Sequence, residues 1–465
     1  MESRLNLFSP IDAVDRGWAW IVSGASFLLM FCVGGTVSSF AVVYIGFIEH
    51  YSTSSCSSFS NNNMTSSNLT LSACDGPRGL LAWVGSLSVF LMCAGGPVLT
   101  GLVDKVGPQR ALLAGTMFLV SGLLLTSLTD TVWQLFLTYS VPIGVGSALV
   151  RTTSLSLLPY YFQTKLVVAT SVAVTGRFVG VASLTPICRI LMKSYGWRRM
   201  LQMSALVGIP MLACTALFRP SVSFRAAKAN TMRHVVNCCK LQKNVRLMVY
   251  IWAAAVHVTA ITIPATYIVE YAEQTLGVDE NVSGLLLTAM ALAAALSNIL
   301  TGLIGRRVAR KMILLQFLIA VGGFSSLVFP FYHSYLHLVV YMIAQGVAFG
   351  YLSLVYVIPQ TSRMVCVHDT KDVFALQSLT MAVGTLGTPV GGWMYDRMGS
   401  YTPGFLLSGI IAIVASITLF LDVYLQKESV KNNCSPVEKD PNSCMQADCV
   451  GGDHFPTVYY YETYV

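Results

Sequence analysis

Two arginines lie deep inside long apolar stretches of this sequence, at Arg151 and Arg177. If both stretches are helices, the rise of about 1.5 Å per residue places both guanidinium groups roughly 16–18 Å below the nearest polar loop. Two positive charges at one depth repel each other, and no Asp or Glu occurs in the middle of any apolar stretch. Since arginine binds carboxylates through two parallel hydrogen bonds, the pair predicts a site for a carboxylate substrate. The alternative is that one arginine bonds to backbone carbonyls and only supports helix packing.

These arginines belong to a chain with a membrane-protein composition. Of its 465 residues 54% are hydrophobic and only 11% are charged, whereas a globular domain carries about a quarter charged residues. A helix needs roughly 20 apolar residues to cross a bilayer, and in hydrocarbon each such segment must be helical. The twelve stretches predicted to span the membrane are residues 19–47, 80–103, 110–129, 132–158, 165–188, 200–218, 248–271, 283–305, 311–332, 335–358, 373–395 and 402–425.

The basic residues predict the orientation of these spans in the bilayer. An even number of spans puts both termini on one side, and most Lys and Arg residues, such as Lys105, Arg219 and Arg225, fall on that side. Few fall on the opposite side, among them Arg78 and Lys193. This asymmetry predicts cytosolic termini in a multi-pass protein of the plasma membrane. Because the basic residues are spread over many loops, no nucleic-acid surface is expected.

The first outer loop carries two kinds of extracellular signal. Asn63 and Asn68 each begin an N-glycosylation sequon, which is used only on the luminal side. Cys56 and Cys74 flank the sequons in the same oxidising compartment, so they are candidates for a disulfide. The alternative is that both cysteines are free thiols.

A basic break at residues 219–247 divides the chain into a bundle at 19–218 and a second at 248–425. The segment before the first bundle, 1–18, is expected to be cytosolic. Within the break, the spacing of basic and apolar residues after Met232 predicts an amphipathic helix on the inner membrane surface. The polar, non-periodic residues 426–465 are predicted to form a disordered cytosolic tail.

Local motifs are distributed along nearly the whole chain outside the tail and the first outer loop. They are Asp15-Arg-Gly-Trp-Ala-Trp20, Gly95-Gly-Pro97 followed by Asp104-Lys-Val-Gly-Pro-Gln-Arg110, Tyr161-Phe162 through Gly176, Tyr195-Gly-Trp-Arg198, and Gly387-Thr-Pro389 through Tyr395-Asp-Arg-Met-Gly399. Together these motifs resemble the monocarboxylate transporter family of the major facilitator superfamily. The resemblance implies an all-α membrane protein with twelve transmembrane helices in two six-helix bundles, which rock around a central site.

The resemblance also implies roles for the helix ends. In the superfamily, an Asp, a Gly turn and an Arg in the loop after the second span bridge neighbouring helices and lock one conformation; Asp104 and Arg110 match this pattern. Asp396 is a third candidate for conformational gating. The family further implies a single-span ancillary subunit as a possible partner.

The sequence departs from the family at the positions of its usual ionisable machinery. The family's Lys late in the first span is Ser38 here, and its Asp and Arg in the eighth span are Ala294 and Asn298. Proton–lactate symport therefore does not transfer residue by residue. Ser38, Asn298 and Gln345 are predicted to line the cavity as polar contacts to substrate.

Two side chains are candidates for proton coupling. His257 lies near the middle of the seventh span and can titrate near neutral pH; the alternative is a hydrogen-bonded packing residue. Glu270 lies toward the outer end of the same span, and its alternative is an ordinary interfacial charge.

The chain ends with Thr463 at the third-last position and Val465 last. This pattern is that of a PDZ ligand, which adds a strand and buries its terminal carboxylate and apolar side chain. The alternative is an idle terminus.

The leading hypothesis is a secondary transporter of small organic anions, most of all monocarboxylates, that works by alternating access and is coupled to protons or exchanges anions. The alternative is a transporter-like protein that no longer transports and acts as a ligand sensor or scaffold through its tail. No paired carboxylates, metal ligands or nucleophile–base pairs favour an enzyme. No motif indicates a nucleotide, cofactor or metal.

Overall fold

The computed structural model describes part of the chain, and several predicted features fall outside that part. The predicted glycosylation sites Asn63 and Asn68, the cysteines Cys56 and Cys74, the surface helix after Met232 and the terminal Thr463 and Val465 are not among the described residues. The described residues are 17–44, 46–48, 50, 78–162, 164–218, 245–305, 311–350, 356, 358, 370–385 and 387–433.

The described residues form helices and no strand. The first half contains α1 (Trp18–Ser38), α4 (Arg78–Ala94), α5 (Gly96–Val106), α6 (Pro108–Thr126), α7 (Val132–Leu135), η2 (Phe136–Ser140), α8 (Val141–Ser156), α9 (Leu158–Tyr161), α10 (Leu166–Ser204), η3 (Ala205–Val207) and α11 (Gly208–Thr215). The second half contains α14 (Val245–Leu276), α15 (Glu280–Ser283), α16 (Leu285–Gly305), α17 (Lys311–Leu327), η4 (Phe329–Phe331), α18 (Tyr335–Phe349), α20 (Thr370–Gly384), α21 (Gly387–Met398) and α22 (Thr402–Asn433).

Within the described residues, each of the twelve predicted spans contains a helix or consecutive helices. Within the described residues, seven helices are long and apolar enough to cross a membrane, and α4 and α5 make an eighth when counted as one bent span. The fifth and sixth predicted spans appear as one continuous stretch, Leu166–Thr215. Its two parts are separated by a kink at Gly196, whose φ of 77° is accessible to glycine at little cost.

Proline and glycine explain the other irregularities of the spanning helices. The second span bends by 59° between α4 and α5, where Gly95 precedes a proline in the first turn of α5. The fourth span contains the π-helix η2, which is followed directly by α8 with Pro142 in its first turn. Because proline lacks the N–H that would bond to the preceding turn, the hydrogen-bond pattern widens there.

The last helix corrects one sequence-based boundary. The disordered tail was expected from residue 426, but α22 continues to Asn433. Helix propensity in this polar segment, which contains Gln426, Lys427 and Glu428, extends the helix beyond its apolar part.

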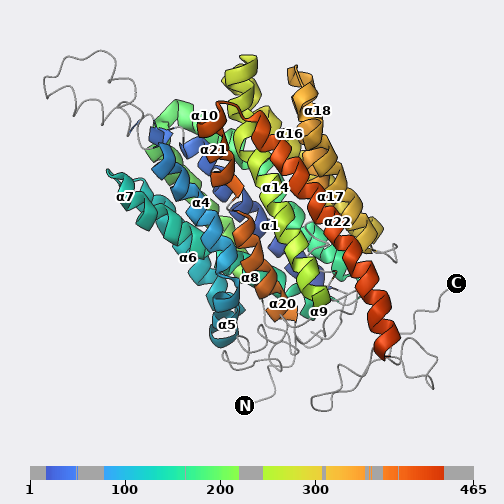
Figure 1. The fold of residues 1–465 in the computed structure, drawn as a ribbon. Helices are drawn as coiled ribbons and strands as arrows, with labels where there is room; N and C mark the ends of the chain where they lie inside the picture. The colour runs from blue at the N-terminus through green and yellow to red at the C-terminus, as the bar shows by residue number, and fades with distance from the viewer. Residues whose placement is uncertain are drawn as a thin grey trace, which may run out of the picture.

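The helices run side by side, with α4, α6 and α7 of the first half on the left of the view and α17, α18 and α22 of the second half on the right (Figure 1). In the first half α1 packs on α10, and α8 packs on both α4 and α6. In the second half α22 packs on α14 and α17, and α16 packs on α18. The two halves meet along two seams, α10 against α16, and α4 and α5 against α20.

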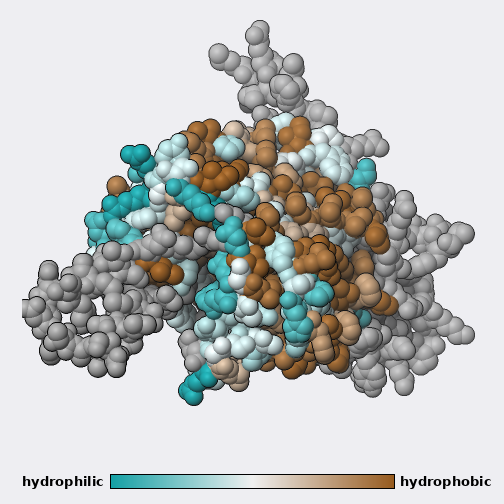
Figure 2. Space-filling model, turned by 90° about the horizontal axis from the view of Figure 1, so that it is seen from above, coloured by the Kyte–Doolittle hydropathy of each residue, from teal (hydrophilic) through white to brown (hydrophobic). Residues whose placement is uncertain are grey.

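The outer helices present apolar side chains to their surroundings. Viewed along the helices, hydrophobic residues occupy much of the margin of the molecule (Figure 2). Exposed apolar side chains include Met117 and Leu125 on α6, Leu296 on α16, Phe324 on α17 and Ile417 on α22. Exposed apolar surface over several helices is what contact with lipid requires.

Glycines allow α1 and α10 to cross at close range. A Cβ atom added at Gly176 would collide with the carbonyl oxygen of Phe27, and one at Gly180 with that of Phe31. On the facing helix, a Cβ at Gly34 would lie 2.6 Å from the backbone oxygen of Arg177. Small residues at such crossings let two backbones approach each other in a membrane, and this approach fixes the position of Arg177 against α1.

The close crossing predicts the effect of a larger side chain at Gly176. Gly176→Val forces α1 and α10 apart, and overpacking of this kind costs about 1–3 kcal/mol or more. We expect a lower unfolding midpoint in a thermal assay of the detergent-purified protein. Gly24→Val is the matched control on α1, because no atom lies within 4 Å of a Cβ at Gly24. Equal midpoints for the two variants contradict the role assigned to the crossing.

Candidate functional site

Arg151 and Arg177 line one small cavity, as their depth in the sequence predicts. Arg151 lies on α8 and Arg177 on α10, and the rest of the lining comes from α1 and from Met92 of α4. Ser38, which was predicted to contact substrate, lies in the same lining. The cavity has a volume of about 20 Å³, which is room for about one water molecule. An organic anion therefore enters only if the surrounding helices move apart.

Arg151 is almost fully buried, with 4% of its surface exposed. Its Nη1 donates to the hydroxyl oxygen of Tyr356 at 3.4 Å, and its Nη2 donates to the carbonyl oxygen of Met92 at 3.4 Å. Its Nε is buried without a hydrogen-bond partner. Both hydrogen bonds are long for a charged donor, which normally reaches its acceptor at about 2.7–2.9 Å. The guanidinium thus retains unused donor capacity beside the cavity.

Arg177 makes a different kind of contact. Its guanidinium carbon lies 5.9 Å from the centre of the Phe349 ring, a distance at which the negative face of an aromatic ring attracts a cation. Within the described part of the chain, no hydrogen bond or ion pair reaches the Arg177 side chain. Arg151 has an equivalent partner in Phe374, at 5.7 Å from the ring centre.

No carboxylate among the described side chains neutralises either arginine. A salt bridge that the structure does describe lies on the exposed surface, where Arg198 pairs with Asp130 at 2.6 Å. The cavity therefore holds two positive charges whose described partners are neutral groups: a phenol, a backbone carbonyl and two aromatic rings. Such a site attracts an anion, because an uncompensated charge in a low-dielectric environment gains most from a bound counter-charge.

The aromatic partners are the part of the site that the sequence did not reveal. Phe349, Tyr356 and Phe374 all come from the second half of the chain, whereas both arginines come from the first. In the sequence they are ordinary residues of apolar spans or their ends, without charge or distinctive spacing. Only the packing of the second half against the first makes these three side chains neighbours of the guanidinium groups.

Two predicted substrate contacts lie outside this cavity. The amide nitrogen of Asn298, on α16, donates to the backbone oxygen of Ser171 and to Thr175 Oγ1, both at 2.8 Å on α10. Through these two bonds Asn298 joins the second half of the molecule to the first. The amide nitrogen of Gln345, on α18, lies within hydrogen-bond distance of Gly322 O and of Ser326 Oγ at 2.9 and 2.7 Å. In the described geometry, each amide nitrogen therefore bonds to a neighbouring helix and not to the cavity of the arginines.

The proton-coupling candidates lie apart from the arginines. His257 is completely buried in α14, and a Cβ atom added at Gly322 would be 3.8 Å from its Nε2 and 3.6 Å from Gln345 Oε1. His257 therefore lies inside the second half beside α17 and α18. Glu270, nearer the outer end of α14, accepts a hydrogen bond from Gln274 Nε2 at 2.9 Å, and Gln274 Oε1 accepts one from Tyr395 at 3.1 Å.

The gating candidates lie at helix ends. Asp104 is buried at the end of α5 and Arg110 is exposed near the start of α6; between these helices Gly107 adopts a φ of 94°. Asp396 lies in α21, and its side chain is outside the described part. The structure adds Asp372, which is buried in the first turn of α20, where the helix dipole favours a carboxylate. Asp372 was not singled out from the sequence.

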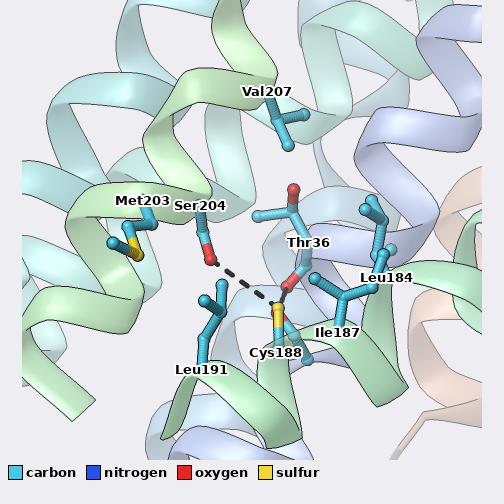
Figure 3. A pocket seen from close by; sticks show the side chains of 10 residues that line it. Thr36, Leu184, Ile187, Cys188, Leu191, Met203, Ser204 and Val207 are labelled. Atoms are coloured by element: carbon cyan, nitrogen blue, oxygen red, sulfur yellow. Dashed lines mark hydrogen bonds between the residues drawn. The ribbon is translucent and has the colours of Figure 1, made fainter. Parts of the chain in front are cut away.

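A second cavity of about 90 Å³ lies between α1, α10 and η3. Its polar groups include Thr36, Cys188 and Ser204, with Cys188 Sγ and Ser204 Oγ 3.7 Å apart (Figure 3). Ile187 and Met203, on its lining, are exposed. None of the lining residues is charged, so this cavity offers nothing to hold an anion.

The family model of the Major Facilitator Superfamily matches residues 26–268 and 250–451 of the chain. The chain belongs to this superfamily. It is thus a multi-pass membrane transporter and not an enzyme, and the predicted fold of two helical bundles is confirmed.

Monocarboxylate transporter 13 of Rattus norvegicus is 25% identical over 409 residues, covering 86% of this chain and 88% of the relative. Monocarboxylate transporter 2 of Meriones unguiculatus is 27% identical over 433 residues, covering 88% and 84%. These relatives confirm the resemblance seen in the motifs.

Solved structures of the superfamily show the same fold at low sequence identity. The proton:xylose symporter XylE aligns with a TM-score of 0.64 and 12% identity, over 86% of this chain and 96% of that chain. The E. coli fucose:proton symporter FucP aligns with a TM-score of 0.64 and 14% identity, over 87% and 99%. At such identity the likeness concerns the fold alone, and the site must be argued from this chain's own residues.

Proposed function

We propose that this transporter carries small organic anions, above all monocarboxylates, and that Arg151 and Arg177 bind the carboxylate. The observation that carries the proposal is the shared cavity of two guanidinium groups that no described carboxylate neutralises. The relatives named as monocarboxylate transporters support the same substrate class. Ser38 is proposed as a further polar contact, because its residue lines the cavity.

Alternating access follows from the closed state of the site. A cavity of about 20 Å³ does not admit an organic anion. Because Tyr356, Phe349 and Phe374 of the second half lie against the arginines, we propose that loading separates the two halves on one side. The seams available for this motion are α10 against α16 and α4 and α5 against α20. We propose that Asn298 holds the first seam through its bonds to α10, and that Asp104, Arg110 and Asp396 take part in gating at the helix ends.

Proton linkage forms part of the proposal, with His257 and Glu270 as the candidate carriers. Both lie on α14, outside the cavity of the arginines, so a proton bound there acts through movement of the helix and not through contact with the carboxylate.

The PDZ ligand at Thr463 and Val465 and a single-span ancillary subunit are predictions from the sequence. The reading as a non-transporting scaffold gains no support from the described residues or from the relatives.

The arginine site predicts a loss of transport on substitution. Arg151→Ala and Arg177→Ala each remove a charge that binds the carboxylate, and truncating one partner of a buried charge pair costs about 2–5 kcal/mol. We expect uptake of labelled lactate into proteoliposomes to fall at least about tenfold. Arg198→Ala is the matched control, because its guanidinium pairs with Asp130 on the exposed surface. Full uptake by both site variants would falsify the assignment.

Proton linkage predicts a dependence of uptake on external pH. If His257 or Glu270 carries the proton, lactate uptake rises as external pH falls, since the protonated carrier is the form that loads. The double variant His257→Gln with Glu270→Gln is expected to flatten this dependence, whereas Arg198→Ala preserves it. Uptake by the unmodified protein that does not change between pH 6 and pH 8 indicates anion exchange without protons instead.

The proposed orientation places both termini in the cytosol of a plasma-membrane protein and the first loop outside. Asn63 and Asn68 are then glycosylated. We expect the protein from mammalian cells to migrate faster after glycosidase treatment and the Asn63→Gln, Asn68→Gln double variant to be insensitive to the enzyme. A double variant that still shifts places the sugar elsewhere, and an unmodified protein that never shifts contradicts the orientation.

A further inference from the structure

We propose that Phe349 and Phe374 act as caps on the two arginines of the empty transporter, and that they permit the unloaded carrier to return across the membrane. This inference rests on the proposed function, since it concerns the same arginine site. It assigns to the two rings a role that differs from binding substrate: they replace the missing anion when the site closes without one.

The geometry of the caps is the same at both arginines. Phe374, on α20, has its ring centre 5.7 Å from the guanidinium carbon of Arg151. Phe349, at the end of α18, has its ring centre 5.9 Å from that of Arg177. In each pair the cation comes from the first half of the chain and the ring from the second. Each contact therefore exists only while the two halves are closed on each other.

Neighbouring aromatic groups hold both rings in position. Phe349 meets the ring of Phe178 edge to face at 5.3 Å and 75°, and Phe178 directly follows Arg177 on α10. The ring of Phe374 lies 5.2 Å from that of Tyr356, whose hydroxyl accepts the hydrogen bond from Arg151. Since edge-to-face and tilted pairs are the favoured aromatic arrangements, the negative faces of the caps are held near the cations.

The closed structure explains why such caps are needed. A carrier that returns empty must enclose two guanidinium groups in a low-dielectric interior with no anion between them, and an unpaired buried charge is strongly unfavourable. The Phe349 and Phe374 rings supply partial compensation through their quadrupoles. When the site is loaded, the carboxylate supplies the counter-charge instead. The rings should therefore matter more for the empty step of the cycle than for the loaded step.

The two steps can be measured separately in proteoliposomes that contain labelled L-lactate. Exchange, with unlabelled L-lactate outside, uses only the loaded carrier. Net efflux, with no substrate outside, also requires the empty carrier to return. We expect Phe349→Leu and Phe374→Leu to reduce net efflux by about tenfold more than they reduce exchange, which corresponds to about 1.4 kcal/mol on the empty step. Leucine keeps an apolar side chain but has no aromatic face.

Matched variants distinguish the aromatic face from simple bulk. Phe349→Tyr and Phe374→Tyr retain the ring, so their ratio of net efflux to exchange should stay close to that of the unmodified protein. Because both fluxes are measured in the same liposomes, the ratio does not depend on how much protein is incorporated. If the variants of one ring do not reconstitute, the variants of the other ring test the inference independently.

The outcomes separate this inference from the proposed function. If the unmodified protein shows no lactate exchange, or if exchange survives in Arg151→Ala and Arg177→Ala, the proposed anion site is wrong. The role of the two rings as caps is then wrong as well. If exchange depends on the arginines but the leucine variants lower exchange and net efflux equally, or change neither, the caps are overturned while the anion site stands. A lowered ratio in the leucine variants, restored with tyrosine, supports the caps.

Discussion

The central constraint on this protein is the cost of two positive charges inside a membrane. Arg151 and Arg177 line a cavity of about 20 Å³ without a described carboxylate to neutralise them. Taking a guanidinium out of water costs several kcal/mol even after the protein relaxes. Every group that faces the two arginines must therefore compensate this charge or admit an ion that does, and this requirement is the basis of the proposed anion site.

Two other buried polar side chains of the described helices, Asn298 and Gln345, differ from the arginines because their amide nitrogens have close acceptors. Asn298 spans the seam between the halves with two bonds of 2.8 Å, and the amide nitrogen of Gln345 has acceptors on α17 within 3.1 Å. A polar group in hydrocarbon that is fully bonded within the protein stabilises packing. Arg151 instead has two long hydrogen bonds and a buried Nε without a partner, so its guanidinium keeps donor capacity beside the cavity.

The charged site and the two-bundle architecture depend on each other. Glycines at the α1–α10 crossing bring the lining of the cavity against Arg177, while the second half supplies Tyr356, Phe349 and Phe374 as its neutral partners. The electrostatic environment of the arginines is therefore a property of the closed arrangement of both halves. In the proposed cycle, movement of one half relative to the other exposes the cations to water or to substrate, and this exposure would link binding to the movement.

The sequence by itself determined the class of protein, the positions of the described spanning helices along the chain and the place of both arginines within their helices, because hydropathy and helical length depend only on local composition. It also located Ser38 at the cavity, through resemblance to a family position. It could not identify the aromatic partners, the place of Asn298 at the seam, or the separation of His257 from the site. Those features depend on which helix faces meet, and contacts between residues more than a hundred positions apart are fixed only when the two bundles pack together.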